Sequence, residues 1–582
     1  MEKKNWVEEK LAAMNTDQKI GQLLVFGFTG PVITPDVREM IEKYHIGGLR
    51  VTQGFRTMNL FVDVKPGEEV DEQTMRSIMP PKGLNRDFSL NRPIHSTPRE
   101  YAGVLNELRT LAMEHNNGIP LHFTIDQEGS GSDDLLTGQR LFPHPMGLAA
   151  TGDEELTYKV AKAVARQARQ VGINMIHSPT VDVNTNPRNP EIGTRSYAEN
   201  EEMVSKFALQ TLKGFTEEQL MGTGKHFPGR GESEADAHWG LPTVQVDKET
   251  MYDVHLAPYK KLIDAGVPAI MMAHSLYPSL GVTDVPAGMS KSLIQDVLRG
   301  ELGFEGVITT DNMMMGGILK KYEMSEAIVR MLEAGIDLIL NRDESPLRIK
   351  IVEKIKEAVE NGRITEEDLD RKVRRILGLR YEMGLHENGG VVDVEKADEA
   401  IRSDFVNDLA VEAAERSTLL LRDRKNLVPI KKDTKVLLIE QVFSTQEKSS
   451  NFYSHPGLLW EQMSKYSNNV YSVEIPQIPS EEDKKRVLAR IEEADVIVAT
   501  NYYYHKIAQS ITGFVEDVIG DKPTVIVTNT PYAFGAPEQF GSVIVNFHPG
   551  SPECMAATAK ILYGEMESQP KPNNFPSALG NN

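Results

Sequence analysis

The stretch from Lys225 to Pro242, KHFPGRGESEADAHWGLP, carries the densest set of side chains that could do chemistry. Its glycines and prolines disfavour a helix, so these side chains lie on a loop that follows the strand-like run 221–224. Asp236 and His238 are two positions apart, and in an extended segment such residues point the same way. The carboxylate can then hydrogen-bond one imidazole nitrogen and leave the other for proton transfer near neutral pH. A solvated polar loop is the competing interpretation.

The composition narrows the class of protein and of ligand. The 582 residues, 40% of them hydrophobic, are enough for two or more domains with cores of ordinary size. The formal net charge of −20 works against binding nucleic acid or an anionic membrane surface. We therefore expect a small-molecule substrate and no nucleic-acid or membrane partner.

Cysteine usage and the N-terminus point to a reducing compartment. The single cysteine, Cys554, excludes an internal disulfide and a cysteine-based zinc site. We find no cluster with metal-ligand spacing and no cofactor motif, so the sequence predicts neither a metal nor a cofactor. The N-terminus is charged where a signal peptide needs an apolar core, which makes a cytoplasmic location the expectation. The sequence does not indicate an oligomeric state.

Eight short β-rich runs alternate with longer helical patterns before about residue 345. The runs are 23–28, 47–52, 122–127, 173–183, 221–227, 269–274, 306–311 and 337–341. Helical segments such as 154–172 and 251–266 separate most of them. This alternation predicts right-handed βαβ units on a parallel sheet, and eight strands can close into a barrel.

Polar residues recur at the carboxyl ends of these runs. They are Asp126, Asp182, Lys225 with His226, His274 and Asp311. In a (β/α)8 barrel these ends meet at one face, where such enzymes keep their active sites, whereas an open doubly wound sheet would leave them apart. The sequence therefore predicts a TIM-type (β/α)8 barrel over residues 1–385, with His274 among the substrate-binding candidates.

Further segments flank or interrupt this barrel. Residues 54–98 are rich in turn formers and too long for an ordinary connection, so we interpret them as an insertion that shapes the substrate cleft; a surface loop without a role is the alternative. Residues 386–408 are predicted to be a linker and a connecting helix. Buried-type strands at 434–440, 494–503, 523–529 and 542–547 predict a smaller α/β sandwich of the flavodoxin type over 409–567. It lacks a glycine-rich phosphate fingerprint, and 568–582 is expected to be a flexible tail.

Five motifs in order resemble glycoside hydrolase family 3, in its β-N-acetylglucosaminidase (β-N-acetylhexosaminidase) branch. They are IDQEG at 125–129, SPTVDVNTNPRNPEIGTRSY at 178–197, the 225–242 loop, MMAHSLYP at 271–278 and GFEGVITTDNMMM at 303–315. The resemblance implies that Asp311 is the nucleophile and that Asp236 and His238 form the acid/base dyad. It also implies sugar-binding positions at Asp126, Arg195, Lys225 and His226.

The residues themselves agree with that chemistry. Retaining glycoside cleavage needs a carboxylate that attacks the anomeric carbon and a proton donor across the scissile bond. Asp311 ends the apolar run VITTD, a rigid mount for a nucleophile, although an N-cap role is the alternative. The expected activity is a retaining, exo-acting β-N-acetylglucosaminidase, as used in cell-wall recycling, acting on a small β-linked carbohydrate.

The sequence also departs from the family pattern. Where Gly-Gly-Arg usually follows Asp-Gln-Glu-Gly, this chain has SGSDD at 130–134, so the expected arginine is missing, and Asn312 follows the nucleophile in place of the frequent Asp. Two other readings stay open. A histidine acid/base would not repel phosphate, which allows a glycoside phosphorylase, and the missing arginine allows a non-catalytic sugar-binding relative.

Overall fold

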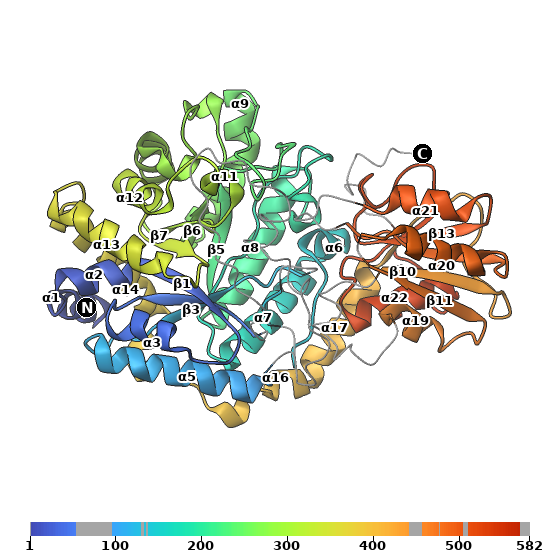
Figure 1. Ribbon diagram of the computed structural model, residues 1–582, viewed down its shortest axis with the longest axis horizontal. Helices are drawn as coiled ribbons and strands as arrows, with labels where there is room; N and C mark the ends of the chain where they lie inside the picture. Colours follow the sequence, from blue (N-terminus) through green and yellow to red (C-terminus); the bar gives the residue numbers. More distant parts are fainter. Residues whose placement is uncertain are drawn as a thin grey trace.

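The computed structural model describes residues 2–53, 96–129, 133–135, 138–441, 457–476, 478–503 and 510–570. The predicted insertion at 54–98 and the predicted tail at 568–582 therefore lie almost entirely outside the described residues. Figure 1 shows two bodies side by side, one coloured blue to yellow and the other orange to red.

The first body is the predicted barrel. Its strands follow the sheet order β7-β6-β5-β4-β3-β2-β1-β8, and every pair is parallel. The barrel closes between β7 and β8, where the Thr310 amide donates to the Leu338 carbonyl at 3.1 Å. The strands are β1 (Leu24–Thr29), β2 (Gly48–Thr52), β3 (His122–Ile125), β4 (Met175–Ile176), β5 (Met221–Phe227), β6 (Ala269–Met272), β7 (Val307–Thr310) and β8 (Ile339–Asn341).

The fourth strand is much shorter than the predicted run 173–183. Regular pairing ends at Ile176, and the chain then enters the segment that contains Pro179. Proline has no amide hydrogen, so a regular ladder cannot run through this position. The segment instead makes single contacts along β5, such as the Val181 amide to the Lys225 carbonyl at 2.7 Å.

Helices surround the barrel. Polar N-cap residues start the two neighbouring helices that begin at Glu154 and Glu201. The Asp153 side chain accepts a hydrogen bond from the Leu156 amide, and the Asn200 side chain accepts one from the Met203 amide. No helix within the described ranges is long and apolar enough to cross a membrane. The helices of this body are α1 (Glu2–Ala12), α2 (Thr16–Gln22), α3 (Pro35–Glu42), α5 (Pro98–His115), α6 (Pro145–Ala150), α7 (Glu154–Gln170), α8 (Glu201–Glu217), α9 (Lys248–Thr250), α10 (Ala257–Asp264), α11 (Gly316–Leu319), α12 (Met324–Ala334), α13 (Leu347–Glu360) and α14 (Glu366–Glu382), with π-helical turns at Met251–His255 and Leu293–Glu301.

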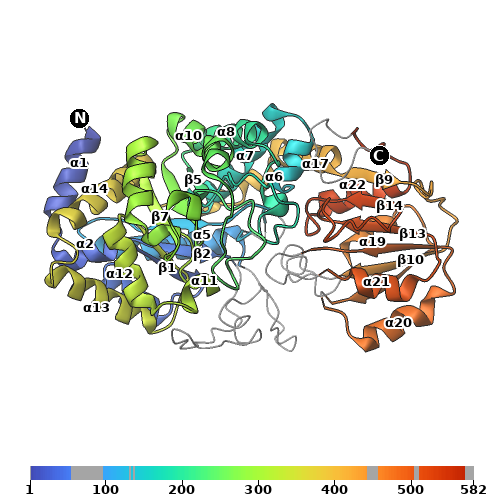
Figure 2. The same ribbon diagram turned by 90° about the horizontal axis from the view of Figure 1, so that it is seen from above.

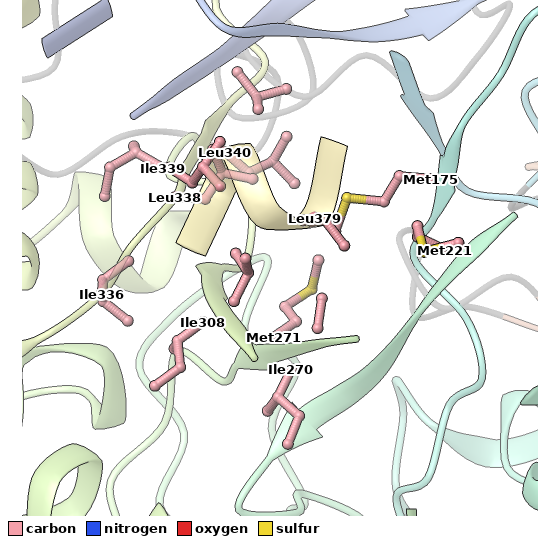
Figure 3. Close-up of a cluster of buried hydrophobic side chains, with 14 of the residues drawn as sticks. Met175, Met221, Ile270, Met271, Ile308, Ile336, Leu338, Ile339, Leu340 and Leu379 are labelled. Atoms are coloured by element: carbon pink, nitrogen blue, oxygen red, sulfur yellow. The ribbon is translucent and has the colours of Figure 1, made fainter. Parts of the chain in front are cut away.

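Apolar side chains occupy the strands below the polar ends. Met175, Met271 and Leu340 come from three different strands and belong with Leu379 of α14 to one apolar cluster (Figure 3). The middle of the barrel is thus a packed core and not a pore. Polar side chains at the carboxyl ends of the strands consequently lie at the mouth.

The second body is the predicted α/β sandwich. Its sheet has the order β11-β10-β12-β13-β14-β9, parallel except for β9 at one edge. The strands are β9 (Leu419–Asp423), β10 (Val436–Gln441), β11 (Val470–Ile475), β12 (Val496–Thr500), β13 (Thr524–Thr528) and β14 (Ser542–Val545); the helices from the connection onward are α15 (Leu385–Asn388), α16 (Glu399–Arg402), α17 (Asp404–Ser417), α19 (Leu458–Met463), α20 (Glu481–Ile491), α21 (Thr512–Ile519) and α22 (Pro552–Leu562).

A short barrel helix joins the two bodies. Met146 and Ala150 of α6 belong to the apolar core of the second sheet, and the His144 amide donates to the Phe547 carbonyl at 3.2 Å. Both views show α6 between the bodies (Figures 1 and 2). The second body is thereby fixed against the barrel wall that leads to the mouth.

The loop that follows β5 packs tightly on the barrel. A Cβ added at Gly231 would lie 1.7 Å from the Val183 carbonyl oxygen, whereas one added at Gly240, in the same loop, would meet nothing within 4 Å.

We therefore expect Gly231→Ala to destabilise the protein by about 1–3 kcal/mol, the usual cost of forcing an atom into a packed site. Gly240→Ala is the matched control and should unfold like the parent. Thermal or urea unfolding of the three proteins measures the difference. Equal stability of both variants would contradict this packing of the loop.

Candidate active site

Asp311 lies at the barrel mouth directly after β7. Its amide donates to the Met272 carbonyl of β6 at 3.2 Å, which fixes the backbone. Helix α11 begins at Gly316 with Met315 as its N-cap, so Asp311 does not cap it. The carboxylate is 13% exposed, and its Oδ2 lies 3.3 Å from Nη2 of Arg230. Asp311 is therefore an anchored carboxylate next to a cation, as a nucleophile requires.

Asp236 and His238 form the pair that their spacing predicts. Nδ1 of His238 donates to Oδ1 of Asp236 at 2.6 Å, and the same oxygen accepts the His238 amide at 2.8 Å. A second carboxylate, Glu191, lies 3.4 Å from the same nitrogen. Burial disfavours the charged ring, but these two carboxylates prevail and raise the pKa of His238 to about 9. At neutral pH the ring is thus protonated, as a general acid must be.

Lys225 and Arg195 both pair with Glu128. Arg195 binds the Glu128 carboxylate with two nitrogens, at 2.8 and 3.2 Å, and Lys225 contacts Glu128 and also Asp126, the latter at 3.2 Å. Burial would raise the pKa of Glu128, yet Arg195 and Lys225 lower it to about 2. These four side chains form a network of salt bridges at the barrel mouth, in which only Asp126, at 25%, keeps substantial exposure.

Arg50 of β2 binds the other side of Asp126. Its side chain is 1% exposed and lies 2.5 Å from Asp126 Oδ2, and it also contacts Asp134. His177 is 3.4 Å from the second oxygen of Asp126. Burial opposes ionisation, but Arg50 and Lys225 keep the pKa of Asp126 well below its ordinary value. Arg50, which comes from another strand, thus supplies a positive charge beside Asp126.

His226 lies between Asp182 and Asp311. Its Nδ1 is 2.7 Å from Oδ2 of Asp182, and its Nε2 is 3.8 Å from Oδ2 of Asp311. Burial and the nearby Arg230 and Arg195 lower the pKa of His226 well below its ordinary value, so the ring is neutral. Burial also raises the pKa of Asp182 to about 6. Asp182 additionally accepts the Arg230 amide at 2.8 Å and so anchors the loop.

His274 is fully buried, and its Nε2 lies 3.2 Å from the carbonyl oxygen of Asn312. Its observed contact is thus with the residue that follows Asp311. All eight sequence-predicted residues nevertheless belong to this one end of the barrel or to the loop beside it.

The sequence analysis missed Glu191, Glu128 and Arg50, and it assigned no role to Arg230, whose Nη2 lies 2.7 Å from Glu191. Glu128 follows Asp126 by two positions in the same motif, a spacing that could have identified it. No local pattern marks the contact of Arg50 with Asp126 or those of Glu191 with Arg230 and His238, since these partners are distant in the sequence.

Within the described residues, one group has metal-ligand spacing, formed by Glu191, Asp236 and His238. The His238 nitrogen already donates to Asp236, and Glu191 is paired with Arg230. Because Arg230 supplies a positive charge there, we assign no metal ion to this group.

The second body contributes a wall beside Glu191. The Tyr503 hydroxyl donates to the Pro190 carbonyl at 2.7 Å, and the Tyr503 ring stacks on Phe534 with centroids 4.7 Å apart. Both aromatic residues line a pocket together with Glu191 and Arg195. The α/β sandwich therefore reaches the site.

The chain is similar to known glycosidases. It is 33% identical over 302 residues to β-hexosaminidase A of Pseudoalteromonas piscicida, which covers 48% of this chain and 50% of that protein. It is 27% identical over 441 residues to a β-N-acetylglucosaminidase/β-glucosidase of Cellulomonas fimi, covering 74% of this chain and 68% of that protein. The match to the first of these relatives thus spans half of its length.

A solved structure shares the whole architecture. The glycoside hydrolase family 3 β-N-acetylglucosaminidase from Paenibacillus sp. str. FPU-7 superposes with a TM-score of 0.78 at 28% identity, covering 96% of this chain and 98% of that one. The model of the glycosyl hydrolase family 3 N-terminal domain matches residues 15–379, the greater part of the chain. The resemblance seen in the motifs is confirmed, and the chain belongs to glycosyl hydrolase family 3.

Proposed function

We propose that this protein is a retaining, exo-acting β-N-acetylglucosaminidase that works through a covalent glycosyl-Asp311 intermediate. The observation that carries the proposal is the pairing, at one barrel mouth, of the anchored Asp311 carboxylate with the 2.6 Å Asp236–His238 hydrogen bond. The names of the relatives support the substrate class, a β-linked N-acetylglucosaminide. A cytoplasmic location and a role in cell-wall recycling are parts of the same proposal.

The reaction then has two steps. An Asp311 oxygen attacks the anomeric carbon while His238 gives its proton to the glycosidic oxygen, so the aglycone leaves as an alcohol. Neutral His238 next takes a proton from water, whose oxygen attacks the anomeric carbon and releases Asp311. Asp236 stabilises the imidazolium form in both steps. Asp126 is the most exposed of the charged residues above, and it would accept hydrogen bonds from sugar hydroxyls.

The first test addresses Asp311. Asp311→Ala should fold like the parent and lose nearly all turnover of an aryl β-N-acetylglucosaminide. Added azide should restore turnover and give a glycosyl azide with inverted anomeric configuration. Asp296→Ala, an exposed aspartate, is the matched control and should keep parental turnover. A tenfold loss of rate corresponds to only about 1.4 kcal/mol of activation free energy. If the Asp311 variant kept activity within that range of the parent, the assignment of Asp311 as the nucleophile would be wrong, and Asp311 would have only a sugar-binding role.

The second test addresses the proton donor. His238→Ala should slow substrates with poor leaving groups by about 100-fold or more and activated aryl glycosides far less, because only the former need protonation as they depart. Asp236→Asn should give the same pattern with a smaller loss. Steady-state kinetics on a series of aryl glycosides measures both. Equal losses across the series would reduce His238 to a positioning role.

The third test decides the acceptor. Phosphorolysis would need an uncommitted cation near the anomeric carbon, and Lys225, Arg195 and Arg230 each pair with a glutamate. This favours water. With millimolar phosphate present, we expect neither the rate nor the product to change. A sugar 1-phosphate as the major early product in phosphorus NMR would instead make the protein a phosphorylase.

A further inference from the structure

Glu191 lies between the acid/base pair and the nucleophile. It is on the segment that follows β4, and its side chain is 1% exposed. One oxygen, Oε2, accepts the Ala237 amide at 3.1 Å, inside the loop that carries the dyad. The other oxygen, Oε1, lies 3.4 Å from Nδ1 of His238 and 2.7 Å from Nη2 of Arg230. A single buried carboxylate thus contacts the backbone and the ring of the acid/base loop as well as Arg230.

Arg230 continues this chain of contacts to the nucleophile. The nitrogen that pairs with Glu191, Nη2, is also 3.3 Å from Oδ2 of Asp311. Its side chain is 1% exposed, so water screens these interactions little. Because a buried guanidinium without a carboxylate is costly, Arg230 must stay between its two partners.

We propose that Glu191, acting through Arg230, is a positioning residue that stabilises the imidazolium form of His238 and fixes it relative to the Asp311 carboxylate. This inference rests on the proposed glycosidase function, because it assigns to Glu191 the control of a proton donor. It goes beyond that function by naming a third acidic residue on which the acid/base step depends.

The charges around His238 support this role. Two carboxylates face the same ring nitrogen. Burial would raise the pKa of Glu191, but Arg230 and His238 keep it below its ordinary value, so Glu191 stays ionised. Burial lowers and the carboxylates raise the pKa of His238, to about 9. The protonated ring, and activity that depends on it, is therefore present below about pH 9 and is lost as the pH rises through that value. The charged and titratable groups that face this cluster include Asp182, Asp236, Asp311, Arg195, Arg230, Tyr277 and Tyr503, with Lys320 bound to the neighbouring Trp239 carbonyl.

The test is Glu191→Gln, which keeps the shape of the side chain and removes its charge. The alkaline limb of the kcat/KM profile should move toward neutral pH by about one unit, the usual effect of an opposite charge at this distance. At pH 8 the loss of kcat/KM in Glu191→Gln should be larger for substrates with poor leaving groups than for substrates with activated leaving groups. An alkaline limb at the parental position would overturn the proposal, because a merely structural role would lower the rate without moving it.

A matched control is available in the same loop. Glu234 is 59% exposed and pairs with Arg188. Glu234→Gln removes the same charge without removing a carboxylate that faces His238, so its alkaline limb should coincide with that of the parent. An equal shift in both variants would mean that the net charge of the protein, and not Glu191, determines the pH of the alkaline limb. That result would also overturn the proposal.

A titration that needs no turnover separates this inference from the proposed function. Proton NMR can follow the His238 ring, assigned by its loss in His238→Ala, in the parent, Glu191→Asp and Glu191→Gln. The midpoint should fall in that order, because the shorter aspartate keeps the charge but recedes from the ring. A parent that cleaves no glycoside would refute the glycosidase function while leaving this titration valid. Identical midpoints in all three proteins would refute the role of Glu191. If Glu191→Gln does not fold, identical midpoints in the parent and Glu191→Asp would refute it.

Discussion

The bidentate ion pair between Arg195 and Glu128 is the interaction on which the mouth of this barrel depends. Both side chains are at most 8% exposed, and neither could remain ionised there alone, because removing a charge from water costs several kcal/mol. Each partner therefore needs a further neighbour of opposite sign. Lys225 binds Glu128 and Asp126, and Arg50 binds Asp126 from the far side. Charges from β2, β3, β5 and the segment after β4 can be buried only together, so they fix each other's positions.

The joint burial of these charges explains which parts of the site could be predicted from the sequence. Parallel strands end at the same face, so Asp126, Lys225 and Asp311 could be assigned to one site from their strand-end positions alone. The Asp236–His238 hydrogen bond followed from a spacing of two. Arg50 and Glu191 were not predictable, because their role comes from partners 76 and 39 or more positions away that only the closed barrel brings near. The sequence shows that charges meet at the mouth but not which cation satisfies which carboxylate.

The same distinction applies to the second sheet. Its central strands β10, β12, β13 and β14 are buried apolar runs, and the sequence predicted all four. The two edge strands, β9 and β11, were missed. β11 has exposed positions at Tyr471 and Glu474, and β9 pairs antiparallel and includes half-buried residues. An edge strand needs only one covered side, so its apolar signal is weak.

The exposed fractions of the charged side chains finally divide the site into two sets. Asp126, Asp311 and His238 keep 25%, 13% and 13% exposure, whereas Glu191 and Arg230 keep 1% each. A substrate can touch the first set directly, which is why the proposed mechanism assigns hydroxyl binding, attack and proton transfer to those residues. The second set can act on the reaction only through the first. Since Tyr503 of the α/β sandwich holds the Pro190 carbonyl next to Glu191, the second domain acts on the same buried set. Its docking on the barrel therefore helps to fix the segment that carries Glu191, the residue that faces His238.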